Sequence, residues 1–247
     1  MMPDVVAERA ALITGGSSGI GFAIARALGN DGFAVTISGR REDKLAGAVE
    51  DLRSEGIEAQ GIPGPADQEQ ALIDLVNGHV EKYGRIDVLV NSAGVGIGGQ
   101  LEGYETKYID MQLAVNIRAM IIVTREAMPY LKESAKEREQ AHVINLASIA
   151  GRYGQPWLSL YAATKAAVAN WTNGMHKEFQ NEGIRFTALS PAFVETPMTE
   201  FAKAGGVPGE KMIRPEDLSS AVLWLLSLSP NARVPEIVFE RVGDDLF

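Results

Sequence analysis

Short apolar runs alternate with longer amphipathic stretches along almost the whole chain. The short runs have the composition of β-strands, and the longer stretches repeat apolar residues near the 3.6-residue period of an α-helix. We predict strands at residues 9–14, 34–38, 58–62, 88–92, 142–147, 185–190 and 236–240. We predict helices at residues 20–30, 41–55, 67–83, 107–135, 158–181 and 215–227.

Residues typical of helix ends support these boundaries. Gly84 and Gly183 each follow a helical pattern, where a left-handed cap is expected, and Pro215 suits the first turn of a helix. The repeated strand–helix order, with nearly continuous apolar strands such as residues 86–90, indicates a parallel sheet that helices cover on both faces. We therefore predict an α/β protein with a doubly wound fold, in which residues 1–247 form a single domain.

Composition excludes several classes of function without selecting one. Of the 247 residues, 46% are hydrophobic and 22% are charged, which is ordinary for a folded soluble protein. A net charge of −9 disfavours nucleic acid as a partner. The chain has no cysteine, so it has no disulfide, thiolate nucleophile or sulfur-based metal site. Since His79, His142 and His176 lack the spacing of metal ligands, we expect no metal site.

The N-terminus shows no secretory signal. The N-terminus has no basic segment and no small-residue cleavage site before its first apolar run. The longest uninterrupted apolar stretch, residues 221–226, is far shorter than a membrane span requires. We therefore expect a cytoplasmic protein that does not cross a membrane.

A glycine-rich loop joins the first predicted strand to the first predicted helix. It reads Thr14-Gly15-Gly16-Ser17-Ser18-Gly19-Ile20-Gly21. Glycine lets a phosphate approach the backbone N–H groups, and the following helix N-terminus favours negative charge. The spacing alone is weak evidence, and a plain tight turn is the alternative interpretation. Because a strand precedes the loop and a helix follows it, we favour a site for the pyrophosphate of a dinucleotide.

The end of the second predicted strand bears on the choice of dinucleotide. It lies about 20 residues past the glycines, where an NAD enzyme usually places an acid on the ribose 2′-hydroxyl. The chain has Gly39, Arg40 and Arg41 there and no acid. A guanidinium could hold a 2′-phosphate, so we expect NADP(H) to be preferred over NAD(H). Alternatively, the two arginines merely begin a solvated helix.

Tyr161 and Lys165 stand four residues apart on a predicted helix, so their side chains share one face. A nearby ammonium stabilises a phenolate, which would lower the pKa of Tyr161 and make it a usable proton donor and acceptor. Ser148 follows the predicted strand 142–147, at the sheet edge where ligands bind in this architecture. Its hydroxyl could hold a substrate carbonyl, although a tyrosine–lysine pair at this spacing is common and carries little weight alone.

Taken together, these residues resemble the short-chain dehydrogenase/reductase family over essentially the whole stretch from Arg9 to Val238. The matching motifs are Thr14-Gly15-x-x-x-Gly19-x-Gly21, Asn91-Ser92-Ala93-Gly94, Asn116, Ser148, Tyr161-x-x-x-Lys165, and Pro191 followed by Thr196. The resemblance implies a Rossmann-like fold with seven parallel strands. It also implies an enzyme that passes a hydride between a nicotinamide and a carbonyl or alcohol.

The resemblance implies a role for each of four catalytic residues. Ser148 would orient the substrate oxygen, Tyr161 would transfer its proton, and Lys165 would bind the nicotinamide ribose and lower the pKa of Tyr161. Asn116 would hold a proton-relay water; alternatively its amide satisfies backbone groups inside a helix that kinks there. The implied cofactor-binding residues are Gly15, Ser17, Ser18, Gly19, Ile20, Gly21, Arg40, Arg41, Asp67, Asn91, Ala93, Gly94, Tyr161, Lys165, Pro191, Val194 and Thr196.

One departure from the family concerns the adenine. Gly64 and Pro65 stand where the family usually has an aspartate and an apolar residue that hydrogen-bond the base. Glycine has no carboxylate and proline no N–H, so cofactor affinity would fall by about tenfold or more. In a shifted alignment, Asp67 would reach the adenine edge instead.

The substrate pocket should be lined by residues 95–99, 149–158 and 193–213. The apolar side chains there suggest a carbonyl on a hydrophobic or aromatic body: Ile97, Tyr153, Trp157, Phe193 and Met198. Arg152 either meets an anionic group or points to water. Residues 193–213, with Gly205 and Gly206, are typical of a mobile lid.

Small residues on the helix that carries Tyr161 would let another helix approach closely. Because the family dimerises through such a surface, we expect a homodimer or homotetramer. The predicted function is an NADP(H)-preferring oxidoreductase that interconverts a carbonyl and a secondary alcohol. A catalytically silent NADP(H)-binding regulatory protein of the same fold is the alternative.

Overall fold

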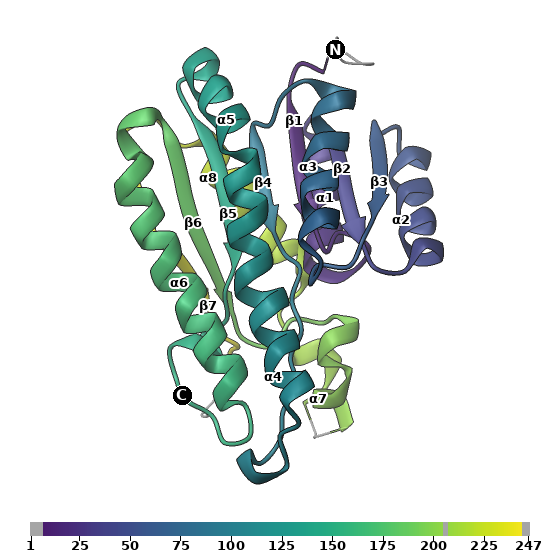
Figure 1. Cartoon of the computed structure of the whole chain (residues 1–247), viewed down its shortest axis with the longest axis vertical. Helices are drawn as coiled ribbons and strands as arrows, with labels where there is room; N and C mark the ends of the chain where they lie inside the picture. Colours follow the sequence, from purple (N-terminus) through teal and green to yellow (C-terminus); the bar gives the residue numbers. More distant parts are fainter. Residues whose placement is uncertain (1–6, 205–206, 244–247) are drawn as a thin grey trace.

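The structure, a computed structural model, describes residues 7–204 and 207–243. In that part of the chain a seven-stranded sheet has the strand order β3-β2-β1-β4-β5-β6-β7, with every neighbouring pair parallel (Figure 1). This confirms the predicted doubly wound fold. The strands are β1 Ala10–Thr14, β2 Ala34–Gly39, β3 Ala59–Pro63, β4 Val88–Asn91, β5 Ala141–Leu146, β6 Ile184–Pro191 and β7 Glu236–Phe239.

Helices cover both faces of this sheet, and each face has its own apolar core. On one face α1 (Gly19–Asn30), α2 (Glu42–Ser54) and α8 (Pro215–Ser227) bury Leu28, Leu52 and Val222 against the strands. On the other face α3 (Glu69–Tyr83), α5 (Ala119–Arg138) and α6 (Ser159–Phe179) bury their apolar stripes. Strands buried on both faces explain why the sequence shows nearly continuous apolar runs there.

The predicted helix 107–135 is interrupted. Residues Thr106–Leu113 form α4, residues Ala114–Arg118 form a π-helical turn, and α5 follows directly. In the π turn the N–H of Ala119 donates to the carbonyl of Ala114, five residues back. The kink that the family resemblance places at Asn116 is therefore a π turn, whose extra residue rotates the Asn116 side chain toward the segment after β4.

Short helical pieces occupy the connections that the sequence pattern left unassigned. The 3-10 turns are Leu101–Gly103, Ile149–Gly151, Gln180–Glu182, Pro197–Thr199 and Gly209–Lys211, and α7 spans Glu200–Ala204. Gly205 and Gly206, part of the predicted lid, lie outside the described residues. In residues 7–204 and 207–243, no helix combines the length and the apolar character that crossing a membrane requires.

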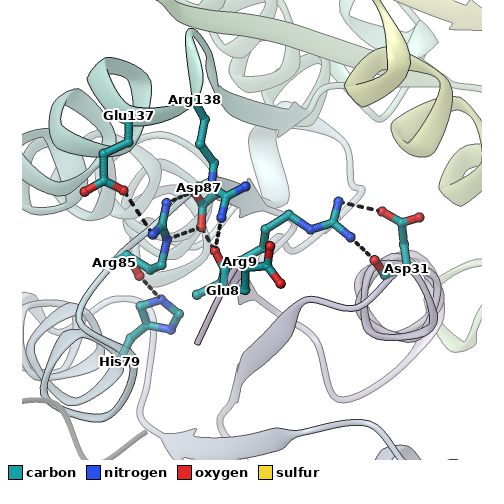
Figure 2. A network of polar contacts seen from close by, with 9 residues as sticks. Glu8, Arg9, Asp31, His79, Arg85, Asp87, Glu137 and Arg138 are labelled. Atoms are coloured by element: carbon teal, nitrogen blue, oxygen red, sulfur yellow. Dashed lines mark hydrogen bonds and ion pairs between the residues drawn. The ribbon is translucent and has the colours of Figure 1, made fainter. Parts of the chain in front are cut away.

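The two ends of the strands differ in their chemistry. At the amino ends of β1 and β4, Asp87 accepts from Arg85 at 2.8 and 2.7 Å and from the N–H of Ala10 at 2.8 Å. Arg138 and Glu137 of α5 extend this ion-pair network, as Figure 2 shows. The network ties the chain together at this edge. The carboxyl ends of β1, β2, β4, β5 and β6 meet at the opposite edge and carry the residues that the sequence singled out.

Candidate active site

A long cleft runs along the carboxyl edge of the sheet, beside the start of α1. It is lined by residues of the glycine loop, of the segments after β2 and β4, and of the start of the lid. Among the predicted cofactor-binding residues, those that line it are Gly15, Ser17, Ser18, Gly19, Ile20, Arg40, Arg41, Ala93, Gly94 and Thr196. The structure thus brings together side chains from four separate parts of the chain.

The glycine loop is shaped by two close approaches. Gly15 has a φ of +66°, and a Cβ there would lie 2.8 Å from the backbone of Ala93. Only glycine fits, because the loop after β1 lies against the loop after β4. A Cβ on Gly21 would lie 2.6 Å from the carbonyl oxygen of Gly15. Gly21 does not line the cleft, and it serves instead to let α1 pack on the loop.

The N-terminus of α1 opens into this cleft. Its N-cap, Ser18, makes no side-chain capping bond, and the first turn contains no acidic residue. The first backbone N–H groups of a twelve-residue helix therefore face the cleft with the positive end of the helix dipole. This is the environment that a pyrophosphate requires.

Three cationic side chains line the cleft beyond β2. They are Arg40, Arg41 and Lys44, of which Lys44 was not anticipated from the sequence. None of the three forms an ion pair within the described residues. A Cβ on the neighbouring Gly39 would lie 2.9 Å from the hydroxyl oxygen of Ser17, so glycine keeps this corner open. The corner therefore presents three positive charges without a protein partner, which suits a phosphate group.

The adjoining slot, at the end of β3, is mostly apolar. It is lined by Ile62, Pro63, Gly64 and Ala66, whereas Asp67 is exposed and lines no part of the cleft. The structure therefore does not bring Asp67 to the other cofactor-binding candidates. A Cβ on Gly64 would lie 3.0 Å from the Cβ of Ala71. Helix α3 thus packs too close for a larger residue at Gly64 without a shift of Ala71.

Asn91 lines the slot at the end of β3 rather than the long cleft. Its side chain is buried, and its Nδ2 donates to Asn145 Oδ1 at 2.8 Å and to Thr124 Oγ1 at 3.1 Å. Thr14, at the same level of the sheet, accepts from the N–H groups of Ser92 and Ala93 at 3.1 Å each. These bonds fix the segment after β4, which in turn forms the floor of the cleft.

Ser148, Tyr161 and Lys165 gather around a smaller cavity that shares Ile20, Gly94 and Thr196 with the cleft. Pro191 and Val194, also predicted to bind the cofactor, line this cavity as well. Ser148 Oγ accepts from the N–H of Ala150 at 3.2 Å and donates to the carbonyl of Pro191 at 3.4 Å. Lys165 Nζ donates to the carbonyl of Leu146 at 2.6 Å and lies 5.7 Å from the centre of the Tyr161 ring.

Burial dominates the protonation of this pair. It raises the pKa of Tyr161, and the hydrogen bond from Ser148 opposes that shift. Burial also lowers the pKa of Lys165 to about 8. The expected lowering of the Tyr161 pKa by the ammonium is therefore not what the structure gives. The reason is that loss of hydration penalises the phenolate more than the available partners favour it.

Asn116 is buried and bonded on every side. Its Oδ1 accepts from the N–H of Val95 at 2.8 Å, and its Nδ2 donates to the carbonyl of Val95 at 2.9 Å and to Thr164 Oγ1 at 3.0 Å. A Cβ on Gly94 would lie 3.5 Å from both Asn116 Oδ1 and Lys165 Nζ. The amide therefore binds backbone groups next to the lysine, which matches the alternative interpretation in part.

A third cavity opens beyond Tyr161 and shares Ser148, Ala192 and Met198 with the second. Phe193 and Met198 line it as predicted, whereas Ile97, Tyr153 and Trp157 do not. Leu158 and Phe201, which lie in the predicted lining segments 149–158 and 193–213 but were not singled out there, also line this cavity.

Arg152 does not line this cavity. It pairs with Glu236 on β7 through bonds of 3.1 and 2.5 Å, and Glu236 also accepts from Ser190 at 2.6 Å. Its side chain is 45% exposed, so it lies at the surface, where it is bonded to an acid of its own chain. The partner lies 84 residues away in the sequence, so only the fold brings the two together.

At this edge, a glycine loop and a helix N-terminus suited to phosphate lie beside a cavity that contains a tyrosine and a lysine. This arrangement is that of an oxidoreductase with a Rossmann-like fold. The sequence model of the short chain dehydrogenase family matches residues 9–205, and the chain belongs to this family. The family shows that the protein is an oxidoreductase.

Relatives and solved structures agree with this assignment. An uncharacterised oxidoreductase of Staphylococcus epidermidis is 31% identical over 237 residues, 96% of this chain and 99% of that protein. The 3-ketoacyl-(acyl-carrier-protein) reductase of Brucella melitensis, solved with NADH, has 27% identity and a TM-score of 0.85 over 95% of this chain and 97% of that one. A variant of the actinorhodin polyketide ketoreductase, solved with NADPH, has 28% identity and a TM-score of 0.84 over 94% of each chain.

Proposed function

We propose that this oxidoreductase uses NADP(H) in preference to NAD(H) and interconverts a carbonyl and a secondary alcohol. The observation that carries the proposal is the cavity shared by Ser148, Tyr161 and Lys165, which adjoins a cleft lined by three cations that form no ion pair with the described residues. The similar structures of a ketoreductase with NADPH and a ketoacyl reductase with NADH support the same class of cofactor and substrate.

The residues of the cleft fit such a dinucleotide. The glycine loop and the N-terminus of α1 would hold the pyrophosphate, and Arg40, Arg41 and Lys44 would hold the 2′-phosphate. Lys165 has one hydrogen-bond partner among the described residues, the carbonyl of Leu146. Its two remaining N–H donors would therefore be available for ribose hydroxyls. When bound, the cofactor supplies or accepts the hydride.

In this proposal the protein handles the proton and the charge. The Ser148 hydroxyl holds the substrate oxygen, and the Tyr161 hydroxyl donates a proton to that oxygen as negative charge develops on it. Its raised pKa keeps Tyr161 protonated and ready to donate at neutral pH. The Lys165 ammonium favours the transient phenolate, and a water near Asn116 returns the proton through Lys165.

The direct test of this function is an assay panel followed at the nicotinamide absorbance with NADPH and with NADH. The panel contains acetophenone, benzaldehyde, ethyl acetoacetate and 9,10-phenanthrenequinone, together with the corresponding alcohols for oxidised cofactor. We expect turnover of at least one carbonyl with NADPH. Tight binding of NADPH without turnover of any member would contradict the proposal and favour a silent cofactor-binding protein.

Replacing Arg40 by alanine tests the cofactor preference. The Arg40→Ala enzyme is expected to bind NADPH about tenfold or more weakly, because a charge-assisted bond to the 2′-phosphate is lost. Its affinity for NADH, which has no 2′-phosphate, is expected to stay within about twofold. Both dissociation constants are measured by the fluorescence of the reduced nicotinamide.

Two further variants accompany this measurement. Lys44→Ala should weaken NADPH binding in the same direction, since Lys44 lines the same corner. Lys177→Ala removes an exposed positive charge on α6 and should change neither constant. An equal loss of NADPH and NADH affinity in Arg40→Ala would show that the arginine does not read the 2′-phosphate.

The pKa values predict how carbonyl reduction depends on pH. Because burial lowers the pKa of Lys165 to about 8, its ammonium form is lost as the pH rises through that value. Tyr161 has a raised pKa and stays protonated over the same range. We therefore expect kcat/KM to be constant below about pH 7 and to fall above about pH 8. In Lys165→Arg, whose guanidinium stays charged, the remaining activity should not show this fall.

A further inference from the structure

The segment of residues 95–99, which comes after β4, contributes Gly96 to the wall of the third cavity, here called the substrate cavity. Its backbone alternates, with Gly96 and Gly98 exposed while Val95, Ile97 and Gly99 turn toward the protein. Gly96 lines the cavity next to Tyr161. A Cβ on Gly96 would lie 3.6 Å from the Tyr161 ring, so the wall stands in van der Waals range of the proposed proton donor.

Each of the three inward residues is held through its backbone N–H. Val95 donates to Asn116 Oδ1 at 2.8 Å, Ile97 donates to Gln112 Oε1 at 3.2 Å, and Gly99 donates to the carbonyl of Trp157 at 2.8 Å. Asn116 is expected from the family and Trp157 contributes only its backbone. Among these three hydrogen-bond acceptors, Gln112 is therefore the side chain to which the sequence analysis gave no role.

Gln112 belongs to a closed ring of hydrogen bonds. Its side chain is completely buried, and its Nε2 donates to the Tyr104 hydroxyl at 3.0 Å. The Tyr104 hydroxyl in turn donates to the carbonyl of Ile97, whose N–H returns to Gln112 Oε1. Burying an amide is costly unless it is bonded, and here both of its polar atoms are bonded to groups that fix Ile97.

The position of Gln112 couples this ring to the site. It lies one turn before Asn116, on α4, and the π turn begins between them. The two amides hold Val95 and Ile97, the residues on either side of Gly96. Movement at Ile97 would therefore change the space between Gly96 and the ring of Tyr161.

We propose that Gln112 and Tyr104 are positioning residues for carbonyl reduction, which hold Ile97 and thereby fix the wall of the substrate cavity beside Tyr161. Neither side chain lines that cavity, so both act through the backbone of residues 95–99. The proposal rests on the proposed function. It adds the residues that determine how the carbonyl substrate fits beside Tyr161.

The kinetic test uses Gln112→Met, which keeps the length of the side chain and removes both hydrogen bonds, and Tyr104→Phe. With the carbonyl of the panel that the wild-type enzyme reduces fastest, we expect KM to rise about fivefold to tenfold in each variant. The kcat should fall less than about threefold, and the dissociation constant of NADPH should stay within about twofold. Because both residues close one ring, the double variant should be little worse than either single variant.

A second measurement does not depend on activity. Amide hydrogen exchange of the peptide that covers residues 95–99, followed by mass spectrometry, should be about tenfold faster in Gln112→Met, because Ile97 loses its acceptor. The matched control is Gln60→Met on β3, where Gln60 donates to Thr36 and to the carbonyl of Gly78. This control removes the side-chain hydrogen bonds of a glutamine that lies away from the site. It should therefore change neither the amide exchange of residues 95–99 nor KM.

The outcomes separate the two proposals. Faster exchange together with a raised KM supports the positioning role, whereas unchanged exchange, or unchanged KM despite faster exchange, overturns it. If the wild-type enzyme and the Gln60→Met control reduce no carbonyl, the proposed function fails. That result is distinguishable, because the exchange of residues 95–99 still reports whether Gln112 holds Ile97.

Discussion

The Tyr161→Phe enzyme is expected to reduce its best carbonyl at least about 100-fold more slowly than the wild-type enzyme. The substitution removes the hydroxyl from the cavity that Tyr161 shares with Ser148 and leaves the ring in place. Proton transfer by a positioned side chain contributes about 10²–10⁴-fold. Turnover is measured at the nicotinamide absorbance under saturating NADPH.

Binding measurements show whether the loss is chemical. The dissociation constant of NADPH should stay within about twofold in Tyr161→Phe, since the phosphate-binding part of the cleft is untouched. Tyr130→Phe, which removes a phenol hydroxyl from α5, serves as the matched control and should retain full turnover. If Tyr161→Phe kept the wild-type rate, Tyr161 would not be the proton donor and the proposed mechanism would fail.

Much of the fold could be predicted because its determinants are local. Each predicted strand overlaps an observed one, since apolar runs of that length must be buried on both faces of a parallel sheet. Ser148 was placed correctly at the end of β5 by counting from the apolar run. Tyr161 and Lys165 share a helix face because their spacing is close to one turn.

The features that sequence reasoning missed depend on contacts between distant segments. The family resemblance indicates a kink at Asn116, but not that it is a π turn or that the Asn116 amide is held by Val95, 21 residues earlier. Nothing in the sequence singled out Gln112, which is the one residue of α4 that the structure buries. Lys44 could have been found, because it lies in the first turn of the helix that begins directly after Arg40 and Arg41.

The expected adenine site at Gly64, Pro65 and Asp67 also depends on contacts that the sequence does not show. The sequence could show that Gly64 and Pro65 lack the family's hydrogen-bonding groups, but not whether Asp67 compensates. The structure leaves Asp67 exposed and fills the space around Gly64 with Ala71. Reduced adenine affinity therefore remains the prediction for this chain, and the three cations at the other side of the ribose would offset part of the loss.

Asp87 holds three segments at the edge of the sheet opposite the cleft. Its carboxylate is 5% exposed, accepts a bidentate pair of bonds from Arg85 and one from the N–H of Ala10, and lies 3.6 Å from Arg138. Figure 2 shows Arg85 and Arg138 converging on Asp87. A buried ion pair adds little stability compared with two apolar side chains of similar size. Removing one partner, however, leaves the other as a buried charge without compensation.

The Asp87→Ala protein is therefore expected to lose about 2–4 kcal/mol of unfolding free energy, because Arg85 and the N–H of Ala10 lose their acceptor in a buried place. Urea unfolding followed by circular dichroism measures this loss, and the melting temperature should fall by roughly 5–15 °C. Glu137→Ala is the matched control: it removes the 63% exposed second partner of Arg85 and should cost about 0–1 kcal/mol. Equal losses in the two variants would show that burial of Asp87 does not decide the stability of this edge. Because the network lies away from the cleft, kcat at 25 °C should be unchanged in the folded Asp87→Ala enzyme, so a parallel loss of kcat would also contradict the assignment.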